Sequence, residues 1–222
     1  MTQHTIVILA NQFSTGREQS KSKHAQIRDS TDYLIELIKI YEEASNKVLV
    51  INELSLTKET DLALLQSGYK VLKTNRQTKG ALATAALSLD LINETDSIII
   101  IPSNAKVDFN LTEFIQEMKN GDYVAGIVTL SSENPNMSFV RSFKNTIVEI
   151  AEKRIIGTEA TAGIFYFKNK RVFVEAIGWA LVNQVTTNGH FYIAPALNYF
   201  LTQRLPIGRY KIEDQQYTRM EN

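Results

Sequence analysis

The sequence contains no cysteine, and only 4 prolines and 10 glycines occur among its 222 residues. The absence of cysteine excludes a disulfide framework, a thiolate nucleophile and a cysteine-ligated zinc site. The low proline and glycine content excludes collagen-like and Pro/Gly-rich disordered chains. An excess of charge of one sign is also lacking, because 24 lysines and arginines balance 24 aspartates and glutamates. General nucleic-acid binders show a basic excess, so we expect no nucleic acid partner.

Long hydrophobic runs are missing as well. The longest, residues 98–102, is far shorter than the ~20 residues that a membrane span requires. The first ten residues hold a short apolar run without a basic flank or a small-residue cleavage site. We therefore expect no membrane span and a cytoplasmic protein.

The remaining composition is that of a globular protein, with 44% hydrophobic and 22% charged residues. A chain of this length can form one open α/β domain and bury a full core unaided. The sequence shows no internal repeat, low-complexity segment or linker. We expect a single domain over residues 1–222.

Runs of β-branched residues alternate with helical patterns in the first half of the chain. The expected strands are residues 5–10, 47–51, 69–74 and 97–102, and the expected helices are 30–43, 60–67 and 78–91. Ser30 and Asp32 are candidate caps for the first helix, and Gly68 is a candidate stop for the second. This alternation predicts a parallel sheet with right-handed crossovers.

The second half changes character, because strands follow one another with few helices between them. The expected strands are residues 122–130, 138–141, 147–151 and 160–167, and the expected helices are 171–183 and 191–202, the latter interrupted near Pro195. The chain as a whole therefore predicts an α/β fold with a mixed, mainly parallel sheet flanked by helices.

Ligands in open α/β sheets bind at the carboxyl ends of the strands, which directs attention to the loops that follow them. The loop after the first strand contains small residues and cations, namely Ser14, Thr15, Gly16, Arg17, Lys21 and Lys23. Backbone amides and cationic side chains together suit an anion. A solvated polar loop is the alternative, since the segment matches neither a dinucleotide-binding nor a P-loop motif.

Two further loops offer candidate residues with competing explanations. Gly80 lets another group approach the backbone closely, which serves either a ligand or tight packing of an alanine-rich helix. In residues 103–108, a phosphoryl-transfer site needs a carboxylate for Mg²⁺, but Asn104 is neutral. Asp108 is then either a metal ligand or the cap of a helix that begins near Leu111.

Glu152 and Lys153 end a strand beside a turn. The glutamate can accept hydrogen bonds from sugar hydroxyls, and the lysine can neutralise a phosphate. The alternative is an exposed ion pair of little energetic value. His190 is more readily explained as structural than as catalytic, because no two-histidine metal spacing or Ser/His/Asp order is present.

Four segments taken together resemble the sugar-phosphate nucleotidyltransferases, particularly the branch found in capsule and surface-polysaccharide clusters. They are TKGALATAALSLDLI (78–92), IIIIPSN (98–104), SFVRSFKNTIVEIAEKRIIGTEATAGIFYFKNKRVFVEAI (138–177) and NGHFYIAPALNYFL (188–201). The resemblance runs from residue 78 to about residue 212. Glu149 to Phe167 followed by N-G-x-F-Y-x-x-P is its most specific part, because several spaced features agree in order.

This resemblance implies a GT-A-like, Rossmann-related fold that joins a nucleoside triphosphate to a sugar 1-phosphate, releases pyrophosphate and uses Mg²⁺. It divides the domain into a nucleotide-binding half, residues 1–110, and a sugar-binding half, residues 111–222. It also implies the roles of individual residues and the possibility of a homodimer. Thr78, Gly80 and Ala81 would meet the base; Glu152 and Lys153 would hold the sugar and its phosphate; Thr161, Ala162, Gly163 and Tyr192 would line or flank the sugar pocket.

The chain departs from the family pattern on the triphosphate and metal side. The glycine-rich L-x-x-G-x-G-S/T-R loop is replaced by Leu9-Ala10-Asn11-Gln12-Phe13-Ser14-Thr15-Gly16-Arg17, so that Arg17 and either Lys21 or Lys23 would serve as its cations. Asn104 stands at the position of the metal-binding aspartate, and the G-T-x-x-D-L segment with the second metal aspartate is missing. His190 stands where the branch usually has glutamate.

Three functions remain open from the sequence. The first is an active nucleotidyltransferase with a reorganised metal site. The second is a catalytically impaired homologue that binds a nucleotide, a sugar phosphate, a nucleotide sugar or a protein partner. The loss of one preorganised electrostatic group typically costs about 10²–10³ in kcat, and here several are altered together. The third, a GT-A glycosyltransferase, ranks last because residues 103–105 lack an Asp-x-Asp motif.

Overall fold

The structure is a computed structural model that describes residues 3–10, 23–53 and 57–219. Its strands are β1 (His4–Ala10), β2 (Asn46–Asn52), β3 (Lys70–Thr74), β4 (Ser97–Pro102), β5 (Ala105–Val107), β6 (Ala125–Ser131), β7 (Ser138–Phe143), β8 (Thr146–Glu152), β9 (Glu159–Phe167), β10 (Ile207–Lys211) and β11 (Tyr217–Arg219). Its α-helices are α1 (Lys23–Ile40), α2 (Lys58–Ser67), α3 (Ala81–Ala86), α4 (Leu111–Asn120), α5 (Lys170–Val182), α6 (Ile193–Ala196) and α7 (Asn198–Thr202). Two short 3-10 helices are η2 (Leu89–Leu91) and η3 (Asp214–Gln216).

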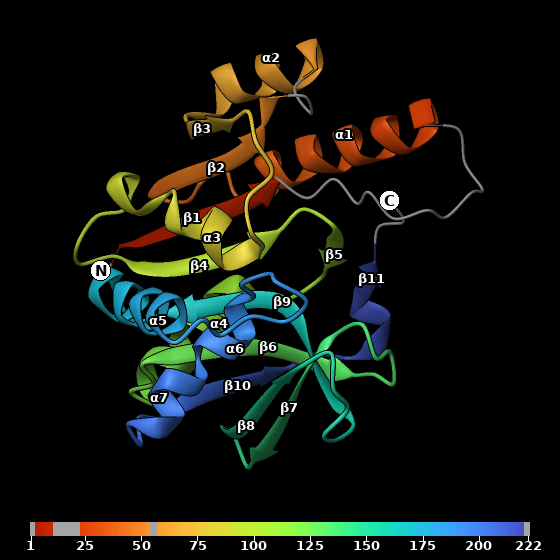
Figure 1. The fold of residues 1–222 in the computed structure, drawn as a ribbon. Helices are drawn as coiled ribbons and strands as arrows, with labels where there is room; N and C mark the ends of the chain where they lie inside the picture. The colour runs from red at the N-terminus through yellow and green to blue at the C-terminus, as the bar shows by residue number, and fades with distance from the viewer. Residues whose placement is uncertain (1–2, 11–22, 54–56, 220–222) are drawn as a thin grey trace.

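A nine-stranded sheet runs through the molecule in the order β3-β2-β1-β4-β9-β6-β10-β8-β7 (Figure 1). The strands from β3 to β4 are parallel, as the alternating pattern of the first half predicts. From β9 onward the pairings are antiparallel, except that β6 and β10 are parallel. The predicted α/β fold with a mixed sheet flanked by helices is therefore confirmed.

Helices cover both faces of the sheet and create two hydrophobic cores. Val7 and Leu9 face a core formed with α3, α5, α6 and α7, whereas Ile6 and Ile8 face a core formed with α1, α2 and α4 (Figure 1). This alternation follows from the two-residue period of a strand. Because β1 is covered on both sides, all of its positions from Ile6 to Leu9 are apolar and buried.

Two helices of the first half differ from their predicted extents. Helix α1 begins at Lys23, so that Ser30 and Asp32 lie inside the helix and do not cap it. The helix predicted over residues 78–91 is confined to α3 and the separate turn of η2. The Ser88 hydroxyl donates to the Ala85 carbonyl at 2.6 Å, which satisfies a carbonyl at the end of α3.

Two details of the remaining chain also differ from prediction, and a third agrees with it. Asn110, not Asp108, caps α4, and its side-chain oxygen accepts from the Glu113 amide at 3.1 Å. The strand predicted from residue 122 begins only at Ala125, after a turn in which Asp122 has a φ of 50°. The interruption predicted near Pro195 in the helix of residues 191–202 is confirmed, because this segment is divided into α6 and α7 with Leu197 between them.

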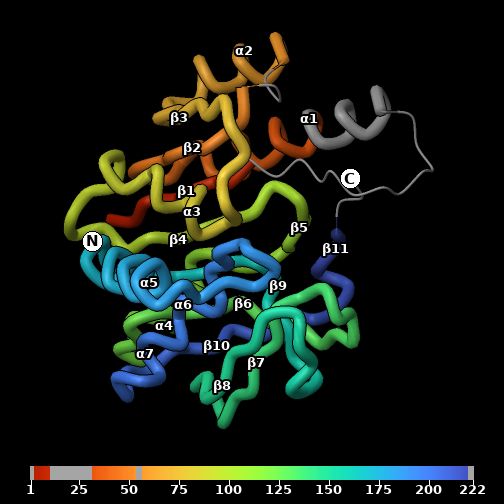
Figure 2. The backbone as a smooth tube through the Cα atoms, in the orientation of Figure 1, coloured from red at the N-terminus to blue at the C-terminus, as the bar shows by residue number. Residues whose placement is uncertain are grey.

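The segment after β4 is not a simple loop, because residues 105–107 form β5. This strand pairs antiparallel with β11, near the end of the described chain (Figure 2). The Tyr33 hydroxyl of α1 donates to the Ala105 carbonyl at 2.6 Å and fixes β5 from the other side. The C-terminal segment is thereby held beside the carboxyl end of β4.

At the opposite, amino ends of the strands, a buried hydrogen-bond network joins β1, β2 and the start of β4. Asp96 is only 1% exposed, and its carboxylate accepts from the Thr5 hydroxyl at 2.8 Å and the Asn93 amide at 3.0 Å. The Thr5 oxygen in turn accepts from the Asn46 amide at 2.9 Å. Each buried polar group of this network therefore depends on its neighbours.

We expect Asp96→Ala to lower the free energy of unfolding by about 1–3 kcal/mol, because it leaves the buried Thr5 hydroxyl without its acceptor. Urea unfolding followed by circular dichroism measures the change. Glu94→Ala is the matched control, since its carboxylate belongs to a surface ion pair with Lys170 and is 74% exposed. Equal stability of the two variants would contradict a structural role for this network.

Candidate functional site

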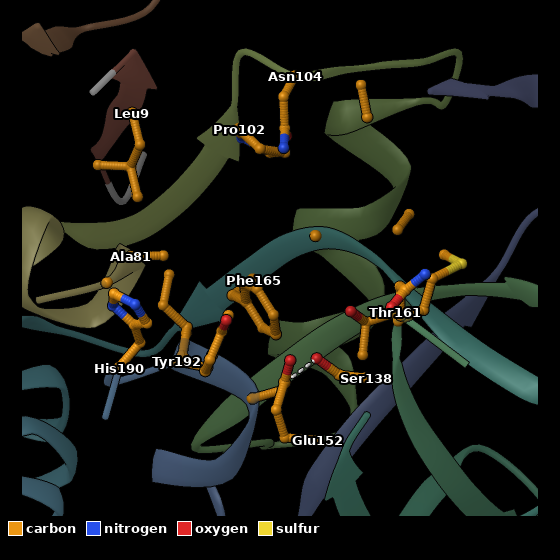
Figure 3. A pocket seen from close by; sticks show the side chains of 18 of the residues that line it. Leu9, Ala81, Pro102, Asn104, Ser138, Glu152, Thr161, Phe165, His190 and Tyr192 are labelled. Atoms are coloured by element: carbon orange, nitrogen blue, oxygen red, sulfur yellow. Dashed lines mark hydrogen bonds between the residues drawn. The ribbon is translucent and has the colours of Figure 1, made fainter. Parts of the chain in front are cut away.

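A pocket of about 430 Å³ opens at the carboxyl ends of β1 and β4 (Figure 3). Its walls come from both halves of the sequence. The first half contributes Leu9, Gln77, Thr78, Gly80, Ala81, Thr84, Pro102, Asn104 and Ala105. The second half contributes Asn136, Met137, Ser138, Glu152, Lys153, Thr161, Ala162, Gly163, Phe165, His190, Tyr192, Ile193, Ala194, Tyr217 and Arg219. The pocket therefore lies where open α/β sheets bind their ligands.

Most residues that the sequence singles out line this pocket. They are Thr78, Gly80, Ala81, Asn104, Glu152, Lys153, Thr161, Gly163 and Tyr192. Asp108 is exposed and is not among the lining residues; its backbone amide and carbonyl both bond to Gln216, at 2.8 and 2.9 Å. Arg17 and the loop around it lie outside the described residues.

Glu152 is positioned by the pairing of β7 with β8, which places it opposite Ser138. The Ser138 hydroxyl donates to Glu152 Oε2, and Figure 3 shows both side chains on the same wall of the pocket. Burial raises the pKa of the Glu152 carboxyl, while the Ser138 hydrogen bond and the Lys153 charge oppose this shift in part. The carboxyl is thus held partly out of water, where it can accept hydrogen bonds from ligand hydroxyls.

The raised pKa has a measurable effect on stability. Because the folded state binds this proton more tightly than the unfolded state, the stability contributed by the carboxyl is greatest at low pH and falls as pH rises through its folded pKa. Glu152→Gln cannot titrate, so we expect its free energy of unfolding, relative to the original protein, to rise from pH 4.5 towards neutral pH and then level off. Urea unfolding of both proteins across this range measures the difference. A difference that stays constant or falls with pH would contradict the raised pKa.

Lys153 follows Glu152 and has an unusual backbone conformation, with a φ of 51°. Its amide donates to the Met137 carbonyl at 3.1 Å, which secures the turn. Its ammonium Nζ donates to the Tyr192 hydroxyl at 2.8 Å and lies 4.8 Å from the centre of the Tyr192 ring. The turn after β8 and the segment before α6 thereby hold one cation in the pocket.

Glycine is required at position 80 because another part of the chain packs closely against it. A Cβ at this position would lie 2.4 Å from the backbone oxygen of Phe191, and its φ is 103°. Phe191 donates to the Lys79 carbonyl at 2.7 Å, and its own carbonyl accepts from the Leu82 amide at 3.1 Å. The group that approaches Gly80 closely is therefore the backbone before α6, and α3 is a helix of only six residues.

This contact joins two walls of the pocket. The segment that meets Gly80 is folded back by a turn at Asn188 and Gly189, which both have positive φ, with Thr187 and His190 bonded to each other across it. Tyr192 comes directly after Phe191, and its side chain lies in the pocket beside that of His190, as Figure 3 shows. His190 itself is exposed.

Gly163 and Pro102 form a second close contact, on the wall of the pocket that carries Asn104. A Cβ at Gly163 would lie 3.0 Å from Pro102 Cγ, and the φ of Gly163 is 83°. This position in β9 adjoins Ala162 and Thr161, which are buried. The two neighbouring strands can therefore converge at the floor of the pocket only with a small residue here.

Several lining residues were not found by sequence reasoning, chiefly Ser138, Asn136, Tyr217 and Arg219. The position of Ser138 follows from its register with Glu152, which a hairpin prediction over residues 138–151 could have supplied. Tyr217 and Arg219 alternate in a polar tail, and a three-residue strand gives no detectable signal.

The described lining residues offer few ligands for a magnesium ion. Within the described part of the chain, no group of three or more histidine, cysteine, aspartate or glutamate side chains is placed to hold a metal. Glu152 is the one carboxylate among the described lining residues, and it is bonded to Ser138 and influenced by the charge of Lys153. Mg²⁺ is commonly held by one or two carboxylates together with substrate phosphates, and among the described lining residues Glu152 alone could serve.

Comparison with known proteins establishes the fold. No protein-family model and no curated protein matches the sequence. Among solved structures, a nucleoside-diphosphate-sugar pyrophosphorylase from Vibrio cholerae RC9 superposes with a TM-score of 0.73 at 17% identity, over 97% of this chain and 95% of the other. The chain shares its fold.

Two further solved structures have the same architecture. The inositol-1-phosphate CTP transferase from T. maritima gives a TM-score of 0.67 at 13% identity, over 100% of this chain and 91% of that one. A UDP-glucose pyrophosphorylase complexed with UDP-glucose gives a TM-score of 0.67 at 13% identity, over 96% of this chain and 91% of that one.

Within the described residues, no helix is both long and apolar enough to cross a bilayer.

Proposed function

We propose that this protein is of the nucleotidyltransferase type and binds a sugar phosphate or a nucleotide sugar in the pocket at the carboxyl ends of β1 and β4. The observation that carries the proposal is that Glu152 and Lys153 share one pocket with Thr78, Gly80 and Asn104. The fold in common with solved nucleotidyltransferases supports it. The resemblance to the branch of capsule and surface-polysaccharide clusters suggests a sugar destined for such a polymer.

The lining residues suit such a ligand chemically. The Lys153 ammonium can pair with a phosphate, and the Glu152 carboxylate and Thr161 hydroxyl can bond to sugar hydroxyls. Leu9, Ala81 and their neighbours offer an apolar surface for a base. The ligand would therefore place its phosphate near Lys153 and its base near α3.

If the protein is an active transferase, an oxygen of the sugar 1-phosphate attacks the α-phosphorus of a nucleoside triphosphate, and the bond to pyrophosphate breaks. Lys153 would neutralise the attacking phosphate, and Arg17 would serve the triphosphate. Members of the resembled family use Mg²⁺ in this reaction. The described lining residues hold a single carboxylate, which favours the second candidate, a protein that binds the ligand without transfer.

One pair of measurements tests the proposal. Pyrophosphate release is followed with each nucleoside triphosphate, Mg²⁺ and a panel of sugar 1-phosphates. Thermal unfolding is followed with the same compounds and with UDP-glucose, dTDP-glucose and CDP-glucose. Release above that of a Lys153→Gln control indicates an active transferase. A thermal shift without release indicates binding alone, and the absence of both overturns the proposal.

A further inference from the structure

The charges around the pocket are predominantly positive. Among its described lining residues, Lys153 and Arg219 are cationic, and Glu152 is the one acidic side chain. Neither cation forms an ion pair with an acidic side chain of the described chain. Within the described chain, both cations thus remain without a carboxylate partner in an ion pair and can pair with an anionic ligand.

The position of Arg219 is set by strand pairing. In the antiparallel pair of β11 and β5, Arg219 lies opposite Ala105, the residue after Asn104. Tyr217, two residues earlier, lies opposite Val107 and also lines the pocket, whereas Thr218 between them does not. This alternation is that of a regular strand, so one side of β11 faces the pocket.

The strand that carries Arg219 is anchored to the rest of the chain just before it. Gln216 bonds to the backbone of Asp108 through both its carbonyl and its side-chain amide. Gln216 and Glu213 also close a reciprocal capping box around η3. Arg219 therefore lies at the end of a short, well-anchored strand, opposite the residue that follows Asn104.

We propose that Arg219 is an anion-binding residue of this pocket, and that Arg219 and Lys153 together balance the phosphate charge of a nucleoside-diphosphate sugar without a divalent cation. The inference rests on the proposed function. The two phosphates of such a ligand would each have one positively charged side chain to pair with, from two different parts of the chain. The planar guanidinium group of an arginine can bond a phosphate through two parallel hydrogen bonds. Because the described lining residues hold a single carboxylate, the proposal assigns the charge balance to these two side chains.

The test measures equilibrium binding of UDP-glucose, dTDP-glucose and CDP-glucose to the full-length protein by calorimetry, once with EDTA and once with Mg²⁺. We expect equal affinity in both media and a loss of about 10- to 100-fold in Arg219→Gln, the usual range for a charged hydrogen bond. Arg219→Lys, which keeps the positive charge but not the planar guanidinium group, should retain more of the affinity than Arg219→Gln. Arg171→Gln is the control, because that arginine is 85% exposed and lies on α5, away from the pocket.

Affinity is also measured over a range of salt concentrations, which separates charge from structure. The original protein should lose affinity more steeply with salt than Arg219→Gln, while the two have the same unfolding temperature without ligand. Unchanged affinity of Arg219→Gln, or binding that requires Mg²⁺, overturns this inference and leaves the proposed function standing. Binding of no probe in either medium overturns the inference, and the proposed function falls with it only if the thermal shifts and pyrophosphate release described above are absent too.

Discussion

Lys153→Gln is expected to weaken binding of a sugar phosphate or nucleotide sugar by about 100-fold or more, since it removes a half-buried positive charge from the phosphate position. The lysine is fixed by the hydrogen bond to Tyr192 and by the left-handed turn after β8, so the original protein has already ordered the cation before the ligand arrives. Calorimetry with the compound that gives the largest thermal shift measures the loss. If the protein is an active transferase, pyrophosphate release should fall by about 10²–10³ as well.

A matched control distinguishes this effect from a general loss of positive charge. Lys168 lies just after β9 and forms a surface ion pair with Asp122, away from the pocket. We expect Lys168→Gln to bind like the original protein. If both variants lose affinity equally, or if Lys153→Gln retains it, then Lys153 does not contact the phosphate.

Gly80→Ala is expected to destabilise the protein by about 3–5 kcal/mol. A Cβ cannot occupy a point 2.4 Å from the Phe191 oxygen, so the two segments must separate. Their separation breaks the hydrogen bonds that Phe191 makes to Lys79 and Leu82, and the positive φ adds strain. Urea unfolding measures the cost, and amide hydrogen exchange at Leu82 and Phe191 should accelerate. Ligand affinity should fall too, because this contact holds two pocket walls together.

Gly178→Ala is a control for which we expect a small gain in stability and not a loss. Gly178 is exposed in α5, no atom lies within 4 Å of the position where a Cβ would be, and its φ is not positive. Alanine in the interior of a helix is better than glycine by about 0.5–1 kcal/mol, so this variant should be slightly more stable. A Gly80→Ala protein as stable as Gly178→Ala would show that the close contact at Gly80 has no structural importance.

The sequence predicts the sheet well where strands are buried on both faces. Residues 98–101 are four isoleucines, and the strand predicted over residues 97–102 has the same bounds as β4. The short strands β5, β10 and β11 were not predicted, because pairing with distant segments, not local pattern, makes them strands. The helix expected from Thr78 begins only at Ala81, after Gly80, whose backbone packs against the distant Phe191.

The same distinction explains which candidate site residues could be identified. Glu152 and Lys153 are adjacent in sequence, so one turn after a predicted strand was enough to suggest them. The two explanations of Gly80 could not be separated, because the group that packs against it is more than a hundred residues away. Arg219 gave no signal, as its approach to Asn104 depends on a strand of three residues.

The sheet order also has a consequence for synthesis on the ribosome. Strand β9 pairs with β4 on one side and β6 on the other, so it completes the middle of the sheet. Until residue 167 has emerged, the very apolar β4 has an open edge that can pair with other nascent chains. Slow translation between residues 102 and 167 would prolong this exposure, and a holding chaperone would be most useful during that interval.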